Sequence, residues 1–256
     1  MDKIRILMLG GTGEARVLAQ RLADLQRFDV LLSLAGRTQQ PSGQPVPTRS
    51  GGFGGAEGLA AFLKEGSFDL LIDATHPFAE RISRNASEAS YAVGIPGLAL
   101  RRPQWAPEPG DCWTEVETVP EAIERLGVSP RRAFLAIGRL GAHRAEAAPQ
   151  HFYLVRSVEP VEPPLALPDV RLILDRGPYN VDSETSLLRT HRIDAVVTKN
   201  SGGLATYAKI EAARRLGIEV IMIARAQAAA LHTVPTIEAM LAAIDHLYPP
   251  EMNRGV

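Results

Sequence analysis

The stretch Leu7–Arg16, LMLGGTGEAR, joins an apolar run to a glycine cluster and then to a helical pattern. Its apolar part belongs to the run IRILML at 4–9, and the segment EARVLAQRLADL that follows is compatible with a helix. The first amides of a helix have no partner within it and attract anions, while glycines let a diphosphate approach the backbone. The stretch therefore predicts a strand, a turn and a helix that bind an anion. A tight turn without a ligand is the alternative interpretation.

Short apolar runs alternate with amphipathic helical patterns along the rest of the chain. The runs lie at 4–9, 29–36, 68–75, 95–100, 131–138, 151–157, 170–177, 194–199 and 218–224. The helical patterns lie at 14–26, 56–65, 78–93, 119–127, 182–191, 203–216 and 235–247. Continuously apolar runs are typical of strands covered on both faces, and strand–helix alternation favours a parallel sheet. We therefore predict an α/β protein with parallel sheets and helices on both faces.

A proline-rich segment near 96–118, which contains RRPQWAPEPGDCW, divides this pattern into two halves. Such a stretch is a poor helix or strand and a good connection. We therefore expect one domain over 1–100 and a second over 101–256. The stretch VEPVEPPLALPD at 158–169 is expected to be a loop inside the second half.

Composition excludes several classes of protein. The 28 Lys and Arg residues balance 29 Asp and Glu residues, which argues against a nucleic-acid partner. The single cysteine, Cys112, forms no internal disulfide, and it and six scattered histidines give no metal site. No apolar stretch approaches the roughly 18 residues of a membrane span, and no secretory signal precedes the first run. These features predict a soluble cytoplasmic protein that has no membrane partner.

The residues after the second run indicate which dinucleotide the first half prefers. They read SLAGRT and include Ser33, Gly36, Arg37 and Thr38, but no acid. NAD-specific folds often carry Asp or Glu there for the ribose hydroxyls, whereas an arginine accommodates the 2′-phosphate of NADP. The stretch therefore favours NADPH over NADH, with Arg37 on the phosphate. A surface arginine in a loop is the alternative.

Polar side chains also follow the third run, in IDATHPFAERISR. Ligands of parallel sheets bind at the carboxyl ends of the strands, so Thr75 and His76 are expected near the glycine turn. Pro77 suits the first turn of a helix, which makes a helix-entry role the alternative for His76. Arg81 lies in that helix, where it would meet a carboxylate or only water.

The second half contains the same pattern of a strand, a glycine cluster and a helix, in the stretch VVTKNSGGLATYAK. Lys199, Asn200, Ser201 and Gly202 would form a second anion-binding turn, with a helix capped by Ser201 as the alternative. Arginine stands beside glycine at two further strand ends, in AIGRLGAH and LDRGPYN. Arg139 and Arg176 are therefore candidates for holding substrate carboxylates.

Five of these segments together resemble a known family. LGGTGEAR, AGR, DATHPFA, RGPY and VTKNSGG occur in the order seen in precorrin-6A reductases of cobalamin biosynthesis, over residues 7 to about 225. One departure is Tyr179, where many relatives carry phenylalanine. The resemblance implies two Rossmann-like domains with the ligands between them, the first binding NADPH and the second binding substrate and closing over the cofactor. It also implies reduction of a ring double bond of a cyclic tetrapyrrole polycarboxylate, in which a hydride goes to one carbon and a proton to its neighbour.

On this basis we assign roles to individual residues. The cofactor contacts are expected from Gly11, Thr12, Gly13, Glu14, Ala15, Ser33, Gly36, Arg37, Thr38, Thr75, Asn200, Ser201 and Gly202. The candidate acids are His76 and Lys199, and the substrate contacts are expected from Arg81, Arg139, Arg176 and Tyr179. The macrocycle nitrogens can carry a proton and water can supply one, so a strong side-chain acid is not required.

Two other functions stay open at this point, and neighbouring pathway enzymes are further partners to consider. One is the cobalt-containing version of the same step, which the sequence does not separate because it offers no cobalt ligand of its own. The other is a non-catalytic NADP sensor, against which the second anion turn and the strand-end arginines argue. A short-chain dehydrogenase is excluded because Tyr207 and Lys209 have the wrong spacing.

Overall fold

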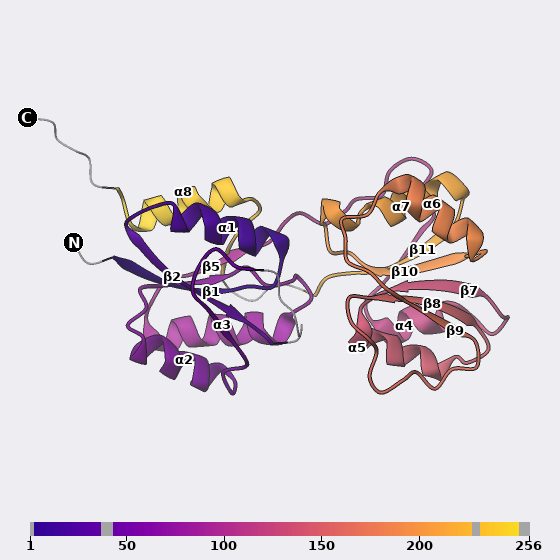
Figure 1. The fold of residues 1–256 in the computed structure, drawn as a ribbon, viewed down its shortest axis with the longest axis horizontal. Helices are drawn as coiled ribbons and strands as arrows, with labels where there is room; N and C mark the ends of the chain where they lie inside the picture. Colours follow the sequence, from indigo (N-terminus) through magenta and orange to yellow (C-terminus); the bar gives the residue numbers. More distant parts are fainter. Residues whose placement is uncertain (1–2, 37–42, 227–230, 251–256) are drawn as a thin grey trace, which may run out of the picture. The chain divides into compact units, whose positions relative to one another are not determined.

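The computed structural model describes residues 3–36, 43–226 and 231–250, and these form two compact units (Figure 1). The first unit comprises residues 1–103 together with 227–256, and the second comprises residues 104–226. Each unit contains a parallel six-stranded sheet. Among the described residues, no helix combines the length and the apolar character needed to cross a membrane.

The sheet of the first unit has the strand order β12-β5-β4-β1-β2-β3. Its strands are β1 (Ile4–Leu9), β2 (Phe28–Leu34), β3 (Thr48–Ser50), β4 (Leu70–Asp73), β5 (Gly97–Leu100) and β12 (His232–Val234). Its helices are α1 (Gly13–Ala23), α2 (Ala56–Glu65), α3 (Glu80–Val93) and α8 (Ile237–Leu247). Counted within the unit, this is the 3-2-1-4-5-6 order of the Rossmann fold.

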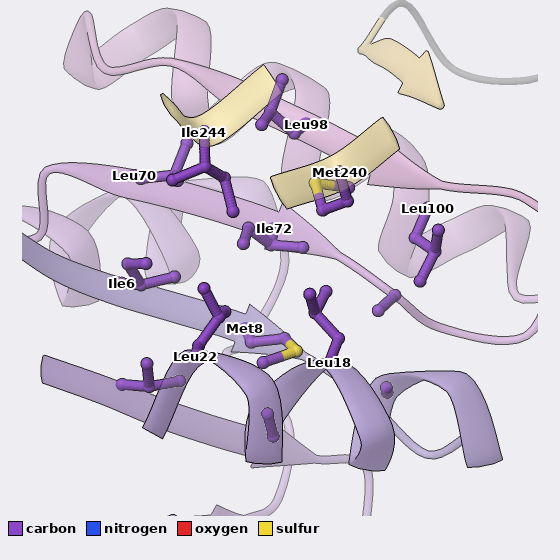
Figure 2. Close-up of a cluster of buried hydrophobic side chains, with 14 of the residues drawn as sticks. Ile6, Met8, Leu18, Leu22, Leu70, Ile72, Leu98, Leu100, Met240 and Ile244 are labelled. Atoms are coloured by element: carbon purple, nitrogen blue, oxygen red, sulfur yellow. The ribbon is translucent and has the colours of Figure 1, made fainter. Parts of the chain in front are cut away.

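Successive side chains of β1 point to opposite faces of this sheet, and both faces are covered. Ile6 and Met8 pack in a cluster with residues of α1 and α8, which Figure 2 shows, whereas Leu7 and Leu9 pack with residues of α2 and α3. Helices α1 and α8 lie over one face and α2 and α3 over the other (Figure 1). This two-sided burial explains why the strand is continuously apolar.

The sheet of the second unit has the strand order β6-β11-β10-β7-β8-β9. Its strands are β6 (Trp113–Val116), β7 (Arg132–Ala136), β8 (Phe152–Ser157), β9 (Val170–Leu174), β10 (Ala195–Lys199) and β11 (Glu219–Ile223). Its helices are α4 (Val119–Glu124), α5 (Arg139–Ala142), α6 (Val181–Thr190) and α7 (Ala208–Leu216), with 3-10 turns at His143–Ala147 and Leu204–Thr206. Helices α6 and α7 cover one face and α4 and α5 the other (Figure 1). The expected α/β fold with helices on both faces is confirmed.

In each sheet, the edge strand beside the fifth of the other strands has a different origin: β12 follows those five strands in the sequence, whereas β6 precedes them. β12 pairs with β5 after the chain has completed the second unit, and β6 pairs with β11 although it precedes the rest of its own sheet. The second domain expected over 101–256 therefore differs from the second unit of the structure, because β12 and α8 belong to the first unit. A strand as short as β12 has no periodicity of its own, and its partner lies more than a hundred residues away in the sequence.

We predict that core substitutions in α8 destabilise the first unit. Met240 is fully buried against the sheet, so Met240→Ala is expected to cost about 2–5 kcal/mol of unfolding free energy. Leu247→Ala, in the same helix but 39% exposed, serves as the control and should change little. Urea unfolding followed by circular dichroism measures the effect, since the two tryptophans, Trp105 and Trp113, report only the second unit. If Met240→Ala instead lowered the stability reported by tryptophan fluorescence, this would contradict the assignment of α8 to the first unit.

Candidate functional site

The first candidate site lies where the chain leaves β1 and β4 at the carboxyl edge of the sheet. β1 pairs with β2 on one side and with β4 on the other, and the chain leads from these two strands in opposite directions across the sheet. Such a switch point is where doubly wound sheets bind ligands. The glycine turn after β1 and the DATHP turn after β4 both begin there.

Thr12 joins these two turns. Its Oγ1 accepts a hydrogen bond from the amide of Ala15 at 3.0 Å, which caps α1, and donates to the carbonyl of Ala74 at 3.0 Å. The preceding residue, Gly11, has a φ of +121°, a conformation that side chains rarely allow. The turn is therefore held in shape by one hydroxyl and one glycine.

The other glycines of the turn indicate what it can hold. A Cβ at Gly10 would lie 2.6 Å from Leu32 Cδ1, so a side chain there would displace the buried Leu32. A Cβ at Gly13 would meet no atom within 4 Å, so the space over the start of α1 is open. Helix amides with open space above them attract phosphate groups. The residues present therefore fit a dinucleotide diphosphate.

The carboxylate of Glu14, at the start of α1, would repel a diphosphate, but Arg102 neutralises this carboxylate. Arg102 Nη1 lies 2.7 Å from Glu14 Oε1. A small pocket adjoins this pair, and it is lined by Thr12, Glu14, Thr75, Pro77, Leu100, Arg102, Pro235, Thr236 and Ile237. The pocket thus brings both predicted turns together with β5 and the start of α8.

The DATHP turn is ordered by a buried carboxylate. Asp73 is fully buried, and its Oδ1 accepts hydrogen bonds from the amide of Thr75 at 3.0 Å and from its hydroxyl at 2.6 Å. Its Oδ2 pairs with the guanidinium of Arg101, which also donates to Ser83 Oγ at 2.7 Å. The Thr75 hydroxyl is therefore bonded inside the turn, and its contact with a cofactor stays a prediction.

His76 follows this turn and is exposed. Its Nδ1 accepts a hydrogen bond from the backbone amide of Phe78 at 3.2 Å. In this arrangement Nε2 is the ring nitrogen that carries the proton. Any acid role of His76 would therefore use Nε2. Arg81, the other candidate on this segment, is exposed in the first turn of α3.

The expected ribose pocket is only partly described. Ser33 is buried at the end of β2, and its Oγ accepts a hydrogen bond from Arg49 Nη1 at 2.7 Å. Gly36 has a φ of +68°. Arg37 and Thr38, to which we assigned the 2′-phosphate, lie outside the described residues. The sequence analysis overlooked Arg49, because β3 is only three residues long.

The second unit has its own switch point, between β7 and β10. Gly138 follows β7 with a φ of +78° and precedes Arg139, whose Nη1 lies 3.2 Å from Glu159 Oε2. Lys199 ends β10, and Asn200, Ser201 and Gly202 form the turn that follows. The structure thus brings Arg139 and the predicted second turn to one edge of this sheet.

Asn200 holds the chain that connects the two units. Its side chain is buried, accepts from the amide of Trp105 at 2.8 Å and donates to the carbonyl of Trp105 at 3.0 Å. The side-chain amide is therefore engaged in a structural contact. Its predicted contact with the cofactor is not tested by these bonds.

The RGPY segment is tied to the same edge. The amide of Tyr179 donates to the carbonyl of Ala205 at 3.0 Å, and its hydroxyl donates to the carbonyl of Asp175 at 3.1 Å. The Arg156 guanidinium lies 4.0 Å from the centre of the Tyr179 ring, and burial raises the pKa of the Tyr179 hydroxyl. One face of this ring is thus covered by a cation. Arg176, in the same segment, is exposed.

Comparison with known proteins extends over almost the whole chain. The family model described as precorrin-6x reductase CbiJ/CobK matches residues 5–245. The precorrin-6A reductase of a Sinorhizobium species is 56% identical over 250 residues, which are 98% of this chain and 96% of that relative. The chain belongs to the precorrin-6A reductase family. This confirms the resemblance found in the sequence.

A solved structure agrees with this assignment. It is described as CobK precorrin-6A reductase, is 44% identical, and superposes with a TM-score of 0.91 over 100% of both chains. A cobalt-precorrin-6A reductase from Priestia megaterium is 27% identical over 86% of this chain and 90% of that relative. The family consists of oxidoreductases of cobalamin biosynthesis, whose reaction calls for a nicotinamide cofactor.

A buried charged cluster in the second unit was missed by the sequence analysis. Arg156 Nη2 lies 2.7 and 2.8 Å from the two carboxylate oxygens of Glu184, and Lys209 Nζ donates to the carbonyl of Thr206 at 2.6 Å. All three charged side chains are buried, and Lys209 Nζ lies 4.8 Å from the centre of a Trp105 ring. The sequence feature that could have indicated this cluster is Lys209, a charged residue at one of the buried positions of α7. Desolvation lowers the pKa of this lysine to about 7, with Glu184 opposing the shift and Arg156 adding to it.

We predict that Lys209 makes stability depend on pH. Its pKa of about 7 in the folded chain lies below the roughly 10.4 of an unfolded lysine. Unfolding therefore takes up a proton between these values, and stability due to this group rises as the pH is raised from 7 toward 10. Lys209→Met should remove this rise, as measured by urea unfolding with tryptophan fluorescence. Parallel pH profiles of the two proteins would contradict a depressed pKa.

Proposed function

We propose that this chain reduces precorrin-6A to precorrin-6B with NADPH in cobalamin biosynthesis. The observation that carries the proposal is the open glycine turn, fixed by Thr12 to the DATHP turn at the switch point of a Rossmann sheet. Membership of the reductase family supports the reaction. The high identity to precorrin-6A reductases, against the low identity to a cobalt-precorrin relative, favours the metal-free substrate.

The first unit would bind the cofactor through its backbone more than through its side chains. The turn Gly11–Gly13 and the amide of Glu14 would hold the diphosphate, with Arg102 neutralising the Glu14 carboxylate. The amide of Ala15 already donates to Thr12 Oγ1, so Ala15 would line the site without adding a donor. Ser33, Gly36, Arg37 and Thr38 would surround the phosphorylated ribose. The cofactor supplies the hydride, and the DATHP turn would place its nicotinamide.

The carboxyl edge of the second sheet has the composition that a tetrapyrrole polycarboxylate requires. Large apolar side chains are exposed there, among them Leu140 (67%), Leu174 (56%) and Leu204 (88%), after or at the ends of three different strands. Arg139 and Arg176 stand beside them. The flat face of a macrocycle would cover the apolar side chains, while its carboxylates would pair with the guanidinium groups.

Two side chains are proposed as acids for the proton that accompanies the hydride. His76 would act as an acid only as the imidazolium: its Nδ1, which accepts a hydrogen bond from the Phe78 amide, would take up a proton, and Nε2 would release one. Lys199 would donate from the carboxyl end of β10. Protonation of a macrocycle nitrogen, or a water molecule, would serve the same purpose.

The proposal is tested by mixing the purified protein with NADPH and precorrin-6A. We expect the absorbance of the reduced nicotinamide to decay only when both the protein and the tetrapyrrole are present, and more slowly with NADH than with NADPH. A cobalt-precorrin-6A sample should be reduced less efficiently. Tight binding of NADPH without any decay would point instead to a cofactor sensor and would overturn the proposal.

Arg176→Ala is predicted to weaken the binding of the tetrapyrrole by about tenfold or more, because an ion-paired hydrogen bond contributes about 1.5–3 kcal/mol. NADPH affinity should not change. Arg171→Ala is the matched control, since Arg171 is also exposed and lies near the start of β9, the strand that Arg176 follows. Fluorescence titration with precorrin-6A measures the effect. Equal affinities for Arg176→Ala and the parent protein would remove Arg176 from the substrate site.

A further inference from the structure

Arg49 is a cation at the carboxyl edge of the first sheet that none of the sequence motifs includes. It lies on β3, and its Nη1 donates to Ser33 Oγ at 2.7 Å and to the carbonyl of Gly51 at 3.1 Å. Its Nη2 donates to the carbonyl of Gly52 at 3.2 Å. The guanidinium is therefore fixed beside the end of β2 and the start of the glycine-rich loop that follows β3.

The register of the sheet places Arg49 in line with the glycine turn. Leu9 of β1 pairs with Ser33 of β2, and Ser33 pairs with Arg49 of β3. Neighbouring strands lie about 4.8 Å apart, so the row crosses about 10 Å from β1 to β3. An adenosine whose diphosphate lies on the turn after β1 extends in this direction, because the ribose of a dinucleotide binds at the end of β2.

Arg49 is held without the help of a carboxylate. Its guanidinium carbon lies 4.1 Å from the centre of the Phe53 ring and 5.1 Å from that of Phe62, and such contacts orient the group while leaving its charge intact. Within the described ranges, Arg49 is in no ion pair, whereas Arg101 and Arg102 of the same unit are paired with Asp73 and Glu14. Its positive charge is therefore preorganised and not neutralised by a described acid.

The donors of the guanidinium are also only partly used. An arginine has five N–H groups, and three of those of Arg49 donate to oxygens of described residues. Within the described part of the chain, the other two N–H groups donate to no oxygen, and they could donate to a bound anion. A phosphate monoester suits such a fork, since guanidinium groups bind phosphate in bidentate geometry.

We infer that Arg49 binds the 2′-phosphate of the adenosine ribose and so makes the site select the phosphorylated cofactor. This inference rests on the proposed function, because it assumes that the dinucleotide lies on the glycine turn. The unphosphorylated cofactor presents a neutral hydroxyl at the same position and gains no ion pair from the guanidinium. Ser33 acts as a positioning residue, since its hydroxyl accepts from Nη1 and fixes the plane of the fork.

The experiment compares the dissociation constants of NADPH and NADH, measured by calorimetry on the full-length chain. Arg49→Met keeps an unbranched apolar stem but removes the charge and the donors, and it should weaken NADPH binding by about tenfold or more. NADH binding should stay within about twofold of the parent value. Arg21→Met is the control, because Arg21 is exposed in the last turn of α1, and it should change neither constant.

Arg49→Lys provides a second variant, because it keeps the charge but loses the planar fork, and it should cause a smaller loss of affinity that is again confined to NADPH. An equal loss of affinity for both cofactors, or an unchanged affinity for NADPH, would show that Arg49 only supports the glycine loop and would overturn the inference. Failure of the parent protein to bind NADPH would instead overturn the proposed function, and this inference with it.

Discussion

The first unit depends on a carboxylate that is fully buried, Asp73. Leaving such a charge unpaired is strongly unfavourable, so the surrounding chain has to supply Arg101 and the hydroxyl and amide of Thr75. Arg101 follows β5 and also bonds Ser83 of α3, so this ion pair connects β4, β5 and α3. Thr12 then attaches the glycine turn to the same strand end. The open start of α1 is in this way held by a rigid frame.

Apart from β12 and β6, the two units have the same strand order, but their switch points present different chemistry. In the first, the edge at the switch point is built from backbone and small residues, which suits a ligand with a diphosphate. In the second, the equivalent edge is flanked by arginines and exposed leucines, which suits a large ring with an acidic rim. The charges of its interior, Arg156, Glu184 and Lys209, serve to order α6 and α7 against the sheet, and Asn200 secures the connecting segment.

Much of the local structure could be predicted, because it follows from local chemistry. β1 runs over the predicted 4–9, α2 over the predicted 56–65, and the turn between β1 and α1 carries the cap that its residues favour. The short edge strands were missed for a physical reason. Strands of three residues, such as β3 and β12, bury too little surface to show a period, and only the neighbouring strand makes them extended.

The sequence by itself determined the class of the fold, the position of the glycine turn and the family, since these depend on short segments whose residues act together. Only the tertiary structure decided which distant side chains complete the sites. Arg101 and Arg102 looked like parts of a linker until β5 placed them against Asp73 and Glu14, and Arg49 gained a meaning only through its register with Ser33. Pairing across a sheet and burial of charge arise between residues that are remote in the chain, and no local pattern records them.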